Sequence, residues 1–270
     1  MATAVTLTTC DGPITFEQGG RRAHLSALTV QRSDAGVTLT DGHGLELDLV
    51  EHLLAALAGL GIRHGVTAVV EGGELPILDG GARAFAEALT SLELPARARE
   101  PAHLVVLRRG CLAEGESSYL FDVGQETDVS VEVEFDHPAI GAQRASWDGS
   151  SRAFLESIAP ARTFGFRADA PALWQCGRAE LAAHSSDPLA LKAFARAVVV
   201  YGEVAPVLSS GEPPPADGEV ARHKLLDLIG DFALYGGPPQ GRVLARRPGH
   251  TASHRIIREA FSLGILSSRP

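Results

Sequence analysis

The sequence contains little cysteine, and this limits the kinds of site that it can build. Its three cysteines, Cys10, Cys111 and Cys176, are an odd number, lie far apart and form no C-x-x-C pair. Neither a disulfide framework nor a zinc site made of thiolates is therefore indicated. If the chain binds a metal ion, the ligands must be histidines and carboxylates.

Clustered positive charge and long apolar runs are also missing. Lys and Arg number 24 against 33 Asp and Glu, for a net charge of −9, and basic residues gather only in short pairs, at 21–22, 108–109 and 246–247. This charge pattern argues against a nucleic-acid partner. The stretch 1–10 lacks the basic start and apolar core of a signal peptide, and no apolar run reaches the roughly 18 to 20 residues that span a bilayer. We expect a cytoplasmic monomer without a transmembrane segment.

The first part of the chain has the pattern of a sheet followed by helices. With 45% apolar and 21% charged residues, the sequence can bury one large core or two modest ones. Residues 1–47 alternate short β-like runs with Gly and Asp turns. Residues 49–62 are apolar on nearly every side, which predicts a buried helix. A strand at 65–71 and a helix at about 82–92 follow.

A linker with two prolines and several charges is predicted at residues 94–103. We place the boundary there, between an N-terminal α+β domain, 1–98, and a C-terminal α+β domain, 99–270. Each is expected to be a mostly antiparallel sheet with helices on one face. In the second domain we expect strands at 104–109, 118–123 and 129–135, a short helix at 151–158 and a long one at 219–235.

The first chemically informative pair is Glu51-His52, inside the apolar helix. A buried carboxylate and imidazole must find hydrogen-bond or metal partners, because burying an unpaired charge costs several kcal/mol. The alternative is that Glu51 only closes a capping box with Asp48 at the start of the helix, while His52 is a satisfied core histidine.

The long helix carries a second set of candidate ligands. At about 100° per residue, His223, Asp227 and Asp231 share one stripe with Lys224 beside it, while leucine, isoleucine and phenylalanine occupy the opposite face. The stripe therefore lies on a surface that is not the core side of the helix. His223 and Asp227 can form an ordinary surface i,i+4 pair, or they can join His52 in the open three-ligand set of a catalytic metal site.

His250 follows Arg247-Pro-Gly near the end of the chain, in what we interpret as a loop. A loop histidine is usually solvated. If the site forms, His250 is instead a candidate proton carrier, with Asp231 to orient and charge it.

Six motifs occur in the order found in the UDP-3-O-acyl-N-acetylglucosamine deacetylases, between about residues 35 and 262. They are VEHLLAALAGLGI (50–62), ELPILDG (74–80), FDHPAI (135–140), ARTFGF (161–166), RHKLLDLIGD (222–231) and GH (249–250). The sequence resembles this family, whose fold is two similar α+β domains with the helices sandwiched between the two sheets and zinc between the domains.

The resemblance implies a metal site and a reaction. His52, His223 and Asp227 are expected to hold Zn²⁺, with Fe²⁺ as the alternative ion in the cell. Glu51 is expected to be the general base for the water that attacks the acetamide carbonyl of an N-acetylated UDP-sugar. The products are acetate and a free 2-amino sugar, a step of lipid A synthesis.

The remaining roles implied by the resemblance belong to five residues. The Thr163 hydroxyl and protonated His250, held by Asp231, are expected to stabilise the oxyanion, and His250 or the general base protonates the departing amine. Phe164 is expected to pack on the sugar ring, and Lys224 to face the nucleotide phosphates. The alternatives are core packing for Phe164 and a solvated charge for Lys224.

The sequence also departs from the family in three places. The family's His-Ser-Gly signature is not found before Thr8, and its Asp-Gly-Ser ends here in Gly81. After Phe166 the family has a Gly-Gly-Ser segment in a compact insert that helps to form the acyl-chain tunnel, whereas here the insert is longer and lacks it. These departures leave two alternatives open, a deacetylase of another N-acetylated sugar and a non-catalytic descendant that binds a sugar nucleotide or a protein. An apolar channel lined by 167–205 would favour the lipid A enzyme.

Overall fold

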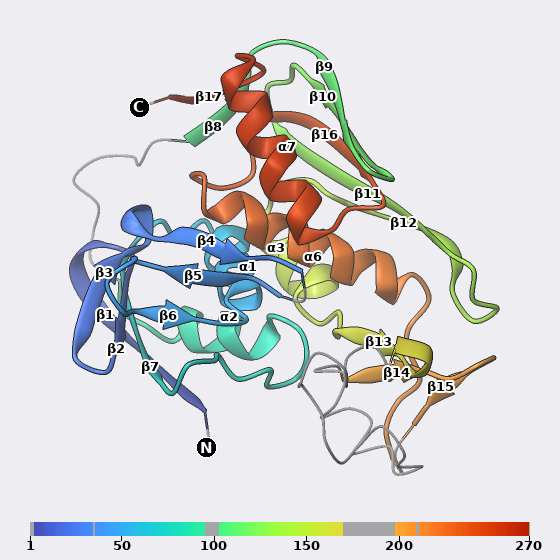
Figure 1. The fold of residues 1–270 in the computed structure, drawn as a ribbon, viewed down its shortest axis with the longest axis horizontal. Helices are drawn as coiled ribbons and strands as arrows, with labels where there is room; N and C mark the ends of the chain where they lie inside the picture. Colours follow the sequence, from blue (N-terminus) through green and yellow to red (C-terminus); the bar gives the residue numbers. More distant parts are fainter. Residues whose placement is uncertain (1–2, 35, 95–102, 170–197, 209–210, 270) are drawn as a thin grey trace.

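The protein is an α+β molecule in which helices lie between sheets. The computed structural model describes residues 3–34, 36–94, 103–169, 198–208 and 211–269 (Figure 1). None of the described helices is both long enough and apolar enough to cross a membrane.

The N-terminal half forms two sheets and two helices. The larger sheet has the order β1-β7-β2-β3, with β1 antiparallel and β2 parallel to β7, and the smaller has the order β4-β5-β6. The elements are β1 (Ala4–Pro13), β2 (Thr15–Gln18), β3 (Arg21–His24), β4 (Thr29–Arg32), β5 (Thr38–Thr40), β6 (Glu46–Leu47), α1 (Glu51–Gly59), β7 (His64–Glu71) and α2 (Arg83–Thr90).

The C-terminal half is built around a sheet of order β12-β11-β16-β10-β9, which is antiparallel except for the β11–β16 pair. Smaller sheets pair β17 with β8 and arrange β13-β14-β15. The elements are β8 (His103–Val106), β9 (Gly110–Glu114), β10 (Ser117–Asp122), β11 (Thr127–Phe135), β12 (Gly141–Trp147), α3 (Ser151–Ala153), β13 (Phe164–Phe166), β14 (Val199–Tyr201), β15 (Pro206–Val207), α6 (Glu219–Ala233), β16 (Gly241–Arg246), α7 (His250–Ser262) and β17 (Leu266–Arg269).

The two halves share an order of elements and meet through helices. In each half a helix, a strand and a second helix follow one another, α1-β7-α2 and α6-β16-α7. Figure 1 shows α1 and α6 in the middle of the molecule, with the four-stranded sheet on one side and the five-stranded sheet on the other. The predicted α+β class is confirmed. The domain boundary at 98/99 lies outside the described residues and stays a prediction.

Both central helices are buried on nearly all sides. In α1, Glu51 and His52 are buried together with the leucines around them. In α6 the polar stripe of His223, Asp227 and Asp231 is buried along with the apolar face. The expectation that this stripe lies away from the core was therefore wrong. The five-stranded sheet covers one side of α6, and α1 and α7 cover the other side.

Helix α1 begins at Glu51, and it is not opened by Asp48. The Asp48 carboxylate accepts hydrogen bonds from the Thr38 hydroxyl at 2.7 Å and from Arg32 at 3.1 Å. Leu49 has φ of 58°, in the left-handed region that a leucine rarely adopts, so the helix cannot extend back through it. The capping-box alternative is wrong, since Glu51 bonds the amide of Val37 instead.

Candidate active site

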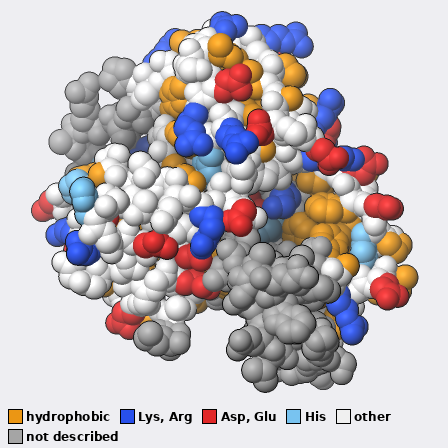
Figure 2. All heavy atoms as spheres, viewed as in Figure 1, with side chains coloured by type: hydrophobic (Ala, Val, Ile, Leu, Met, Phe, Trp, Pro, Cys, Tyr) orange, Lys and Arg blue, Asp and Glu red, His pale blue; other side chains and the backbone are white. Residues whose placement is uncertain are grey.

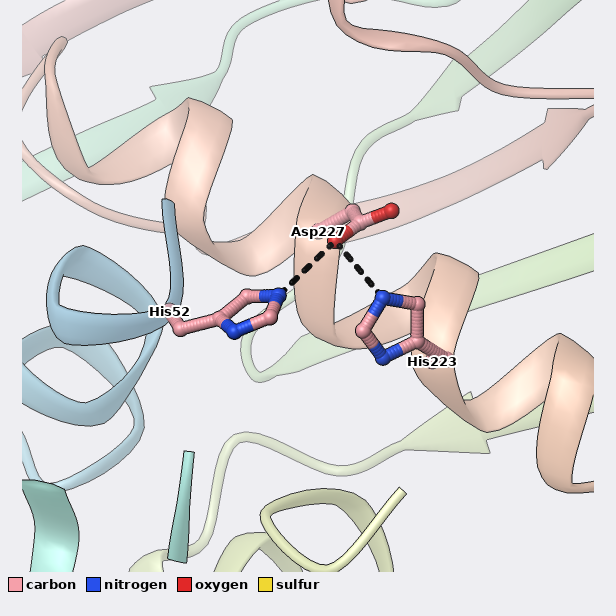
Figure 3. A group of neighbouring side chains, drawn as sticks. All are labelled: His52, His223 and Asp227. Carbon is pink, nitrogen blue, oxygen red and sulfur yellow. Dashed lines mark ion pairs between the residues drawn. The ribbon is translucent and has the colours of Figure 1, made fainter. Parts of the chain in front are cut away.

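Two histidines and an aspartate meet where α1 and α6 touch. His52 comes from the first turn of α1, and His223 and Asp227 from successive turns of α6 (Figure 3). One carboxylate oxygen of Asp227 lies 3.4 Å from His223 Nε2 and 3.9 Å from His52 Nε2. One potential ligand atom from each of the three side chains falls within 4.8 Å of the others. The sequence-predicted metal ligands are thus brought together, although they lie in different halves of the chain.

The donor set fits a divalent cation. His223 Nδ1 lies 3.0 Å from the carbonyl oxygen of Ala161, and because a carbonyl only accepts, Nδ1 carries the proton. The lone pair on His223 Nε2 therefore remains available to bind a metal ion. Histidine ligands in other metal sites are likewise held by a hydrogen bond from the ring nitrogen that does not bind the metal. Two histidines and one carboxylate leave coordination positions open, as in catalytic zinc sites.

The protonation states of His52, His223 and Asp227 also favour the binding of a cation. Burial lowers the pKa of His52 to about 3 and also lowers the pKa of His223. Both imidazoles are therefore neutral near pH 7, the form that binds metal. Burial alone would raise the pKa of Asp227, but neighbouring positive charge, of which Lys224 contributes most, holds that pKa below its usual range.

Lys224 is part of this cluster. Its ammonium group donates to the second carboxylate oxygen of Asp227 at 2.9 Å and lies 5.8 Å from the centre of the Phe164 ring. Burial acts to lower the pKa of Lys224, but the Asp227 carboxylate outweighs this effect and raises it. The alternative of a solvated surface charge is wrong, and contact with nucleotide phosphates stays a prediction.

Glu51 lies beside the three potential ligands, and a hydrogen bond holds one of its carboxylate oxygens in place. Its Oε2 accepts a hydrogen bond from the Val37 amide at 2.9 Å, and its Oε1 lies 4.0 Å from His250 Nε2. Burial raises the pKa of Glu51. A carboxylate whose affinity for a proton is raised in this way suits a general base.

His250 was expected in a loop, and this was wrong: it is the first residue of helix α7. The preceding Gly249 is extended at φ −154° and starts the helix. The sequence feature that could have predicted this helix is the helical spacing of the apolar residues Ile256, Ile257 and Ala260, which are all buried. The helix aims the His250 imidazole inward, so that it is not a solvated loop side chain.

The His250 ring bridges Asp231 and the cluster. Its Nδ1 lies 2.8 Å from Asp231 Oδ1, and its Nε2 lies 3.9 Å from Asp227 Oδ2. Burial opposes the charged form of His250, but Asp231 and then Asp227 outweigh it and raise its pKa to about 10. A charged imidazole next to Glu51 can donate a proton or stabilise developing negative charge.

The segment 161–166 passes along the other side of His223. Ala161 accepts the hydrogen bond from His223, and the Phe164 ring lies edge-on to the His223 ring at 6.0 Å. Thr163 lies between these two residues, and its amide donates to Gly80 at 2.6 Å. The part of Thr163 in oxyanion binding stays a prediction.

Phe164 belongs to an aromatic group that extends away from the metal cluster. Its ring lies 5.6 Å from Phe135, 5.9 Å from Phe166 and 6.3 Å from Tyr201. Figure 2 shows hydrophobic side chains gathered on this face, between the positions of β12 and β13. Phe164 is half-buried and packs against the hydrophobic core, so the core-packing alternative stands and contact with a sugar ring stays a prediction. Most of the expected acyl-chain lining, 167–205, lies outside the described residues.

The glycine that departs from the family motif has a steric reason. A Cβ atom at Gly81 would lie 2.4 Å from the Ala159 carbonyl oxygen and 2.9 Å from that of Ala161. The amide of Ala82 donates to the same Ala159 oxygen at 2.8 Å. A serine at position 81 therefore does not fit unless the backbone of Ala159 and Ala161 moves. The carbonyl group of Ala161 is the one that bonds His223.

These features define a class of protein: an α+β fold with a candidate mononuclear metal site, flanked by a buried carboxylate and an imidazole that can transfer protons. The match to known sequences is more specific. The family model LpxC, described as UDP-3-O-acyl N-acetylglycosamine deacetylase, matches residues 9–262, and the chain belongs to this family. The resemblance inferred from the six motifs is confirmed.

Curated relatives of the same family cover most of the chain. The UDP-3-O-acyl-N-acetylglucosamine deacetylase of Myxococcus xanthus (strain DK1622) is 33% identical over 245 residues, which are 90% of this chain and 73% of the relative. The protein of the same name from Syntrophotalea carbinolica is 29% identical over 90% of this chain and 75% of its own length. That of Brucella ovis is 33% identical over 80% of this chain and 71% of its own length.

Proposed function

We propose that the protein removes the N-acetyl group of UDP-3-O-acyl-N-acetylglucosamine by hydrolysis, in the synthesis of lipid A. The observation that carries the proposal is the meeting of Glu51 and His250, 4.0 Å apart, beside the cluster of His52, His223 and Asp227. The family match and the activity for which the relatives are named support the same reaction.

His52, His223 and Asp227 are the residues that would hold the metal, which we propose is zinc, with Fe²⁺ as the alternative. When bound, the ion supplies a Lewis acid that activates water and polarises the acetamide carbonyl. The rest of the chemistry falls to side chains of this chain.

Glu51 is the proposed general base. The Val37 amide fixes one of its oxygens, and the other is directed towards His250 and the cluster. As the water oxygen bonds to the carbonyl carbon, Glu51 takes the proton that the water loses. Because burial raises the pKa of Glu51, the side chain can keep this proton until a later step uses it.

His250 is the proposed acid and oxyanion partner. Its Nδ1 is held by Asp231, so its Nε2 is free to bind the negative oxygen that forms as water adds, together with the Thr163 hydroxyl. When the carbon–nitrogen bond breaks, the electron pair goes to nitrogen, and His250 or Glu51 supplies the proton. The products are acetate and the 2-amino sugar.

Two further residues are proposed to hold the substrate. Phe164 offers a half-buried ring next to His223, on which the sugar can pack. Lys224 presents a positive charge beside Phe164 and is proposed to face the nucleotide phosphates. Contact with a phosphate would weaken its hydrogen bond to Asp227. A cytoplasmic location and a monomeric state remain predictions from the sequence.

Acetate release by the zinc-loaded protein tests the proposal. The substrate is UDP-3-O-acyl-N-acetylglucosamine, compared with the same nucleotide without its 3-O-acyl chain. Faster turnover of the acylated substrate supports the proposed function. Turnover of the unacylated compound alone would instead indicate a deacetylase of another sugar nucleotide. Turnover of neither by folded, metal-loaded protein would overturn the proposal in favour of a binding role.

A further inference from the structure

Asp231 is buried between two imidazoles, of which the proposed mechanism uses only one. Its Oδ1 lies 2.8 Å from His250 Nδ1 and 3.3 Å from His254 Nε2. Asp231 and His254 are each 1% exposed. His250 and His254 are four residues apart on α7, so both rings project from the same face of that helix towards α6.

Tyr235, just beyond the end of α6, holds the other side of His254. Its hydroxyl lies 3.2 Å from His254 Nδ1. Burial lowers the pKa of His254, which favours the neutral ring with a single N–H. If the Tyr235 hydroxyl donates to Nδ1, the N–H of neutral His254 lies on Nε2 and faces Asp231, which gives the carboxylate a second donor besides His250.

The contact between Asp231 and His254 has unused hydrogen-bonding capacity on both sides. His254 Nε2 and Asp231 Oδ2 are fully buried, and neither makes a hydrogen bond of good geometry with any described residue. The χ2 torsion of an aspartate is soft, so one bond from His250 leaves the carboxylate free to rotate. His254 Nε2, 3.3 Å from Asp231 Oδ1, is the second polar contact that can limit this rotation.

We propose that His254 is a positioning residue: with Tyr235 it limits the rotation of the Asp231 carboxylate and so keeps His250 Nε2 directed at Glu51 and the reacting carbonyl. This inference rests on the proposed function, because the orientation of His250 matters only if His250 acts on a substrate. His254 itself is not placed against the substrate.

Four variants of the full-length, metal-loaded protein test this role. His254→Gln keeps an amide donor near the place of Nε2, His254→Asn keeps one near Nδ1, His254→Leu keeps neither, and Tyr235→Phe removes the anchor. Each is assayed for kcat and KM with UDP-3-O-acyl-N-acetylglucosamine and for bound metal. The NMR signal of the His250 ring N–H gives a readout that does not depend on turnover.

We expect His254→Leu and His254→Asn to lower kcat about tenfold with KM within about twofold, since a small misplacement of a catalytic group is costly. His254→Gln should stay within about threefold of the unmodified protein, and Tyr235→Phe should fall between. The His250 N–H signal should shift or broaden in His254→Leu and return in His254→Gln. Should His254→Leu fail to fold, the Gln and Asn variants, similar in size and polarity, still make the comparison.

The outcomes separate this inference from the proposed function. If the unmodified protein releases no acetate, the proposed function fails, and the N–H signal still reports whether His254 orders the Asp231–His250 pair. If the unmodified protein is active and the Gln and Asn variants have the same kcat and the same His250 signal, the positioning role is overturned while the deacetylase stands.

Discussion

Gly230 on α6 lies against the backbone of Glu51 on α1. A Cβ atom at position 230 would lie 2.4 Å from the Glu51 carbonyl oxygen and 3.4 Å from the Ala55 amide nitrogen. Only a residue without a side chain allows the two helices to approach this closely. We infer that this contact sets the separation between His52 and the potential ligands on α6, and with it the size of the candidate metal site.

Gly230→Ala should consequently push the helices apart. We expect metal affinity to fall at least about tenfold and the free energy of unfolding to fall by about 1–3 kcal/mol, the usual cost of overpacking. Chelator competition and thermal unfolding measure the two effects. Gly12→Ala is the control, because a Cβ at Gly12 meets nothing within 4 Å. Equal metal affinity in Gly230→Ala and the control would show that this contact does not set the site.

Glu51→Gln removes the proposed base and retains an oxygen that can accept from Val37. We expect kcat to fall by about 10²–10⁴-fold with metal content unchanged, in line with the contribution of a general base. Acetate release and metal analysis on the same sample provide the measurement. Glu46→Gln, an exposed change on β6, is the matched control. A near-normal kcat in Glu51→Gln would remove Glu51 from the base role.

Asp227→Ala should lower metal occupancy and also destabilise the apo protein. The carboxylate is at once a potential ligand and the partner of Lys224 at 2.9 Å, so its loss leaves a mostly buried ammonium group without this carboxylate. Breaking a buried pair typically costs about 3–5 kcal/mol. Asp128→Ala, which breaks a surface pair with Arg242, should cost about 0–1 kcal/mol and leave metal binding intact. Full metal occupancy in Asp227→Ala would exclude it as a ligand.

Metal affinity should persist into mildly acidic solution. A histidine ligand with an ordinary pKa near 6.5 loses about tenfold in affinity for each pH unit below that value, so two such ligands would together lose about a hundredfold by pH 5.5. Here burial lowers the pKa of His52 to about 3 and lowers that of His223, so proton competition is delayed to lower pH.

We therefore expect the Kd for Zn²⁺, measured by chelator competition, to change by less than about tenfold between pH 7.5 and 5.5, which is what His223 alone would contribute if its pKa were not lowered. A hundredfold weakening over that range would mean that the two imidazoles titrate as if they were exposed to water.

Local pattern was enough to predict several elements and the identity of the candidate ligands. The stripe of His223 and Asp227 at helical spacing, and the apolar run around Glu51-His52, are properties of neighbouring residues in the chain. The strands 129–135 and 65–71 were predicted close to the observed β11 and β7 for the same reason. By contrast, α7 was not expected, since its polar first turn hides the apolar spacing that follows.

The sequence by itself determined the class of fold, the family and the side chains available for chemistry, because short-range periodicity and ordered motifs are written in consecutive residues. Only the tertiary structure decided how those side chains are used. The amide of Val37 anchors Glu51, the Ala161 carbonyl orients His223, and Asp231 is shared by His250 and His254. These partners meet only when sheets and helices pack. The same packing removes water and shifts the pKa values of Glu51, His223 and His250, which no local spacing can encode.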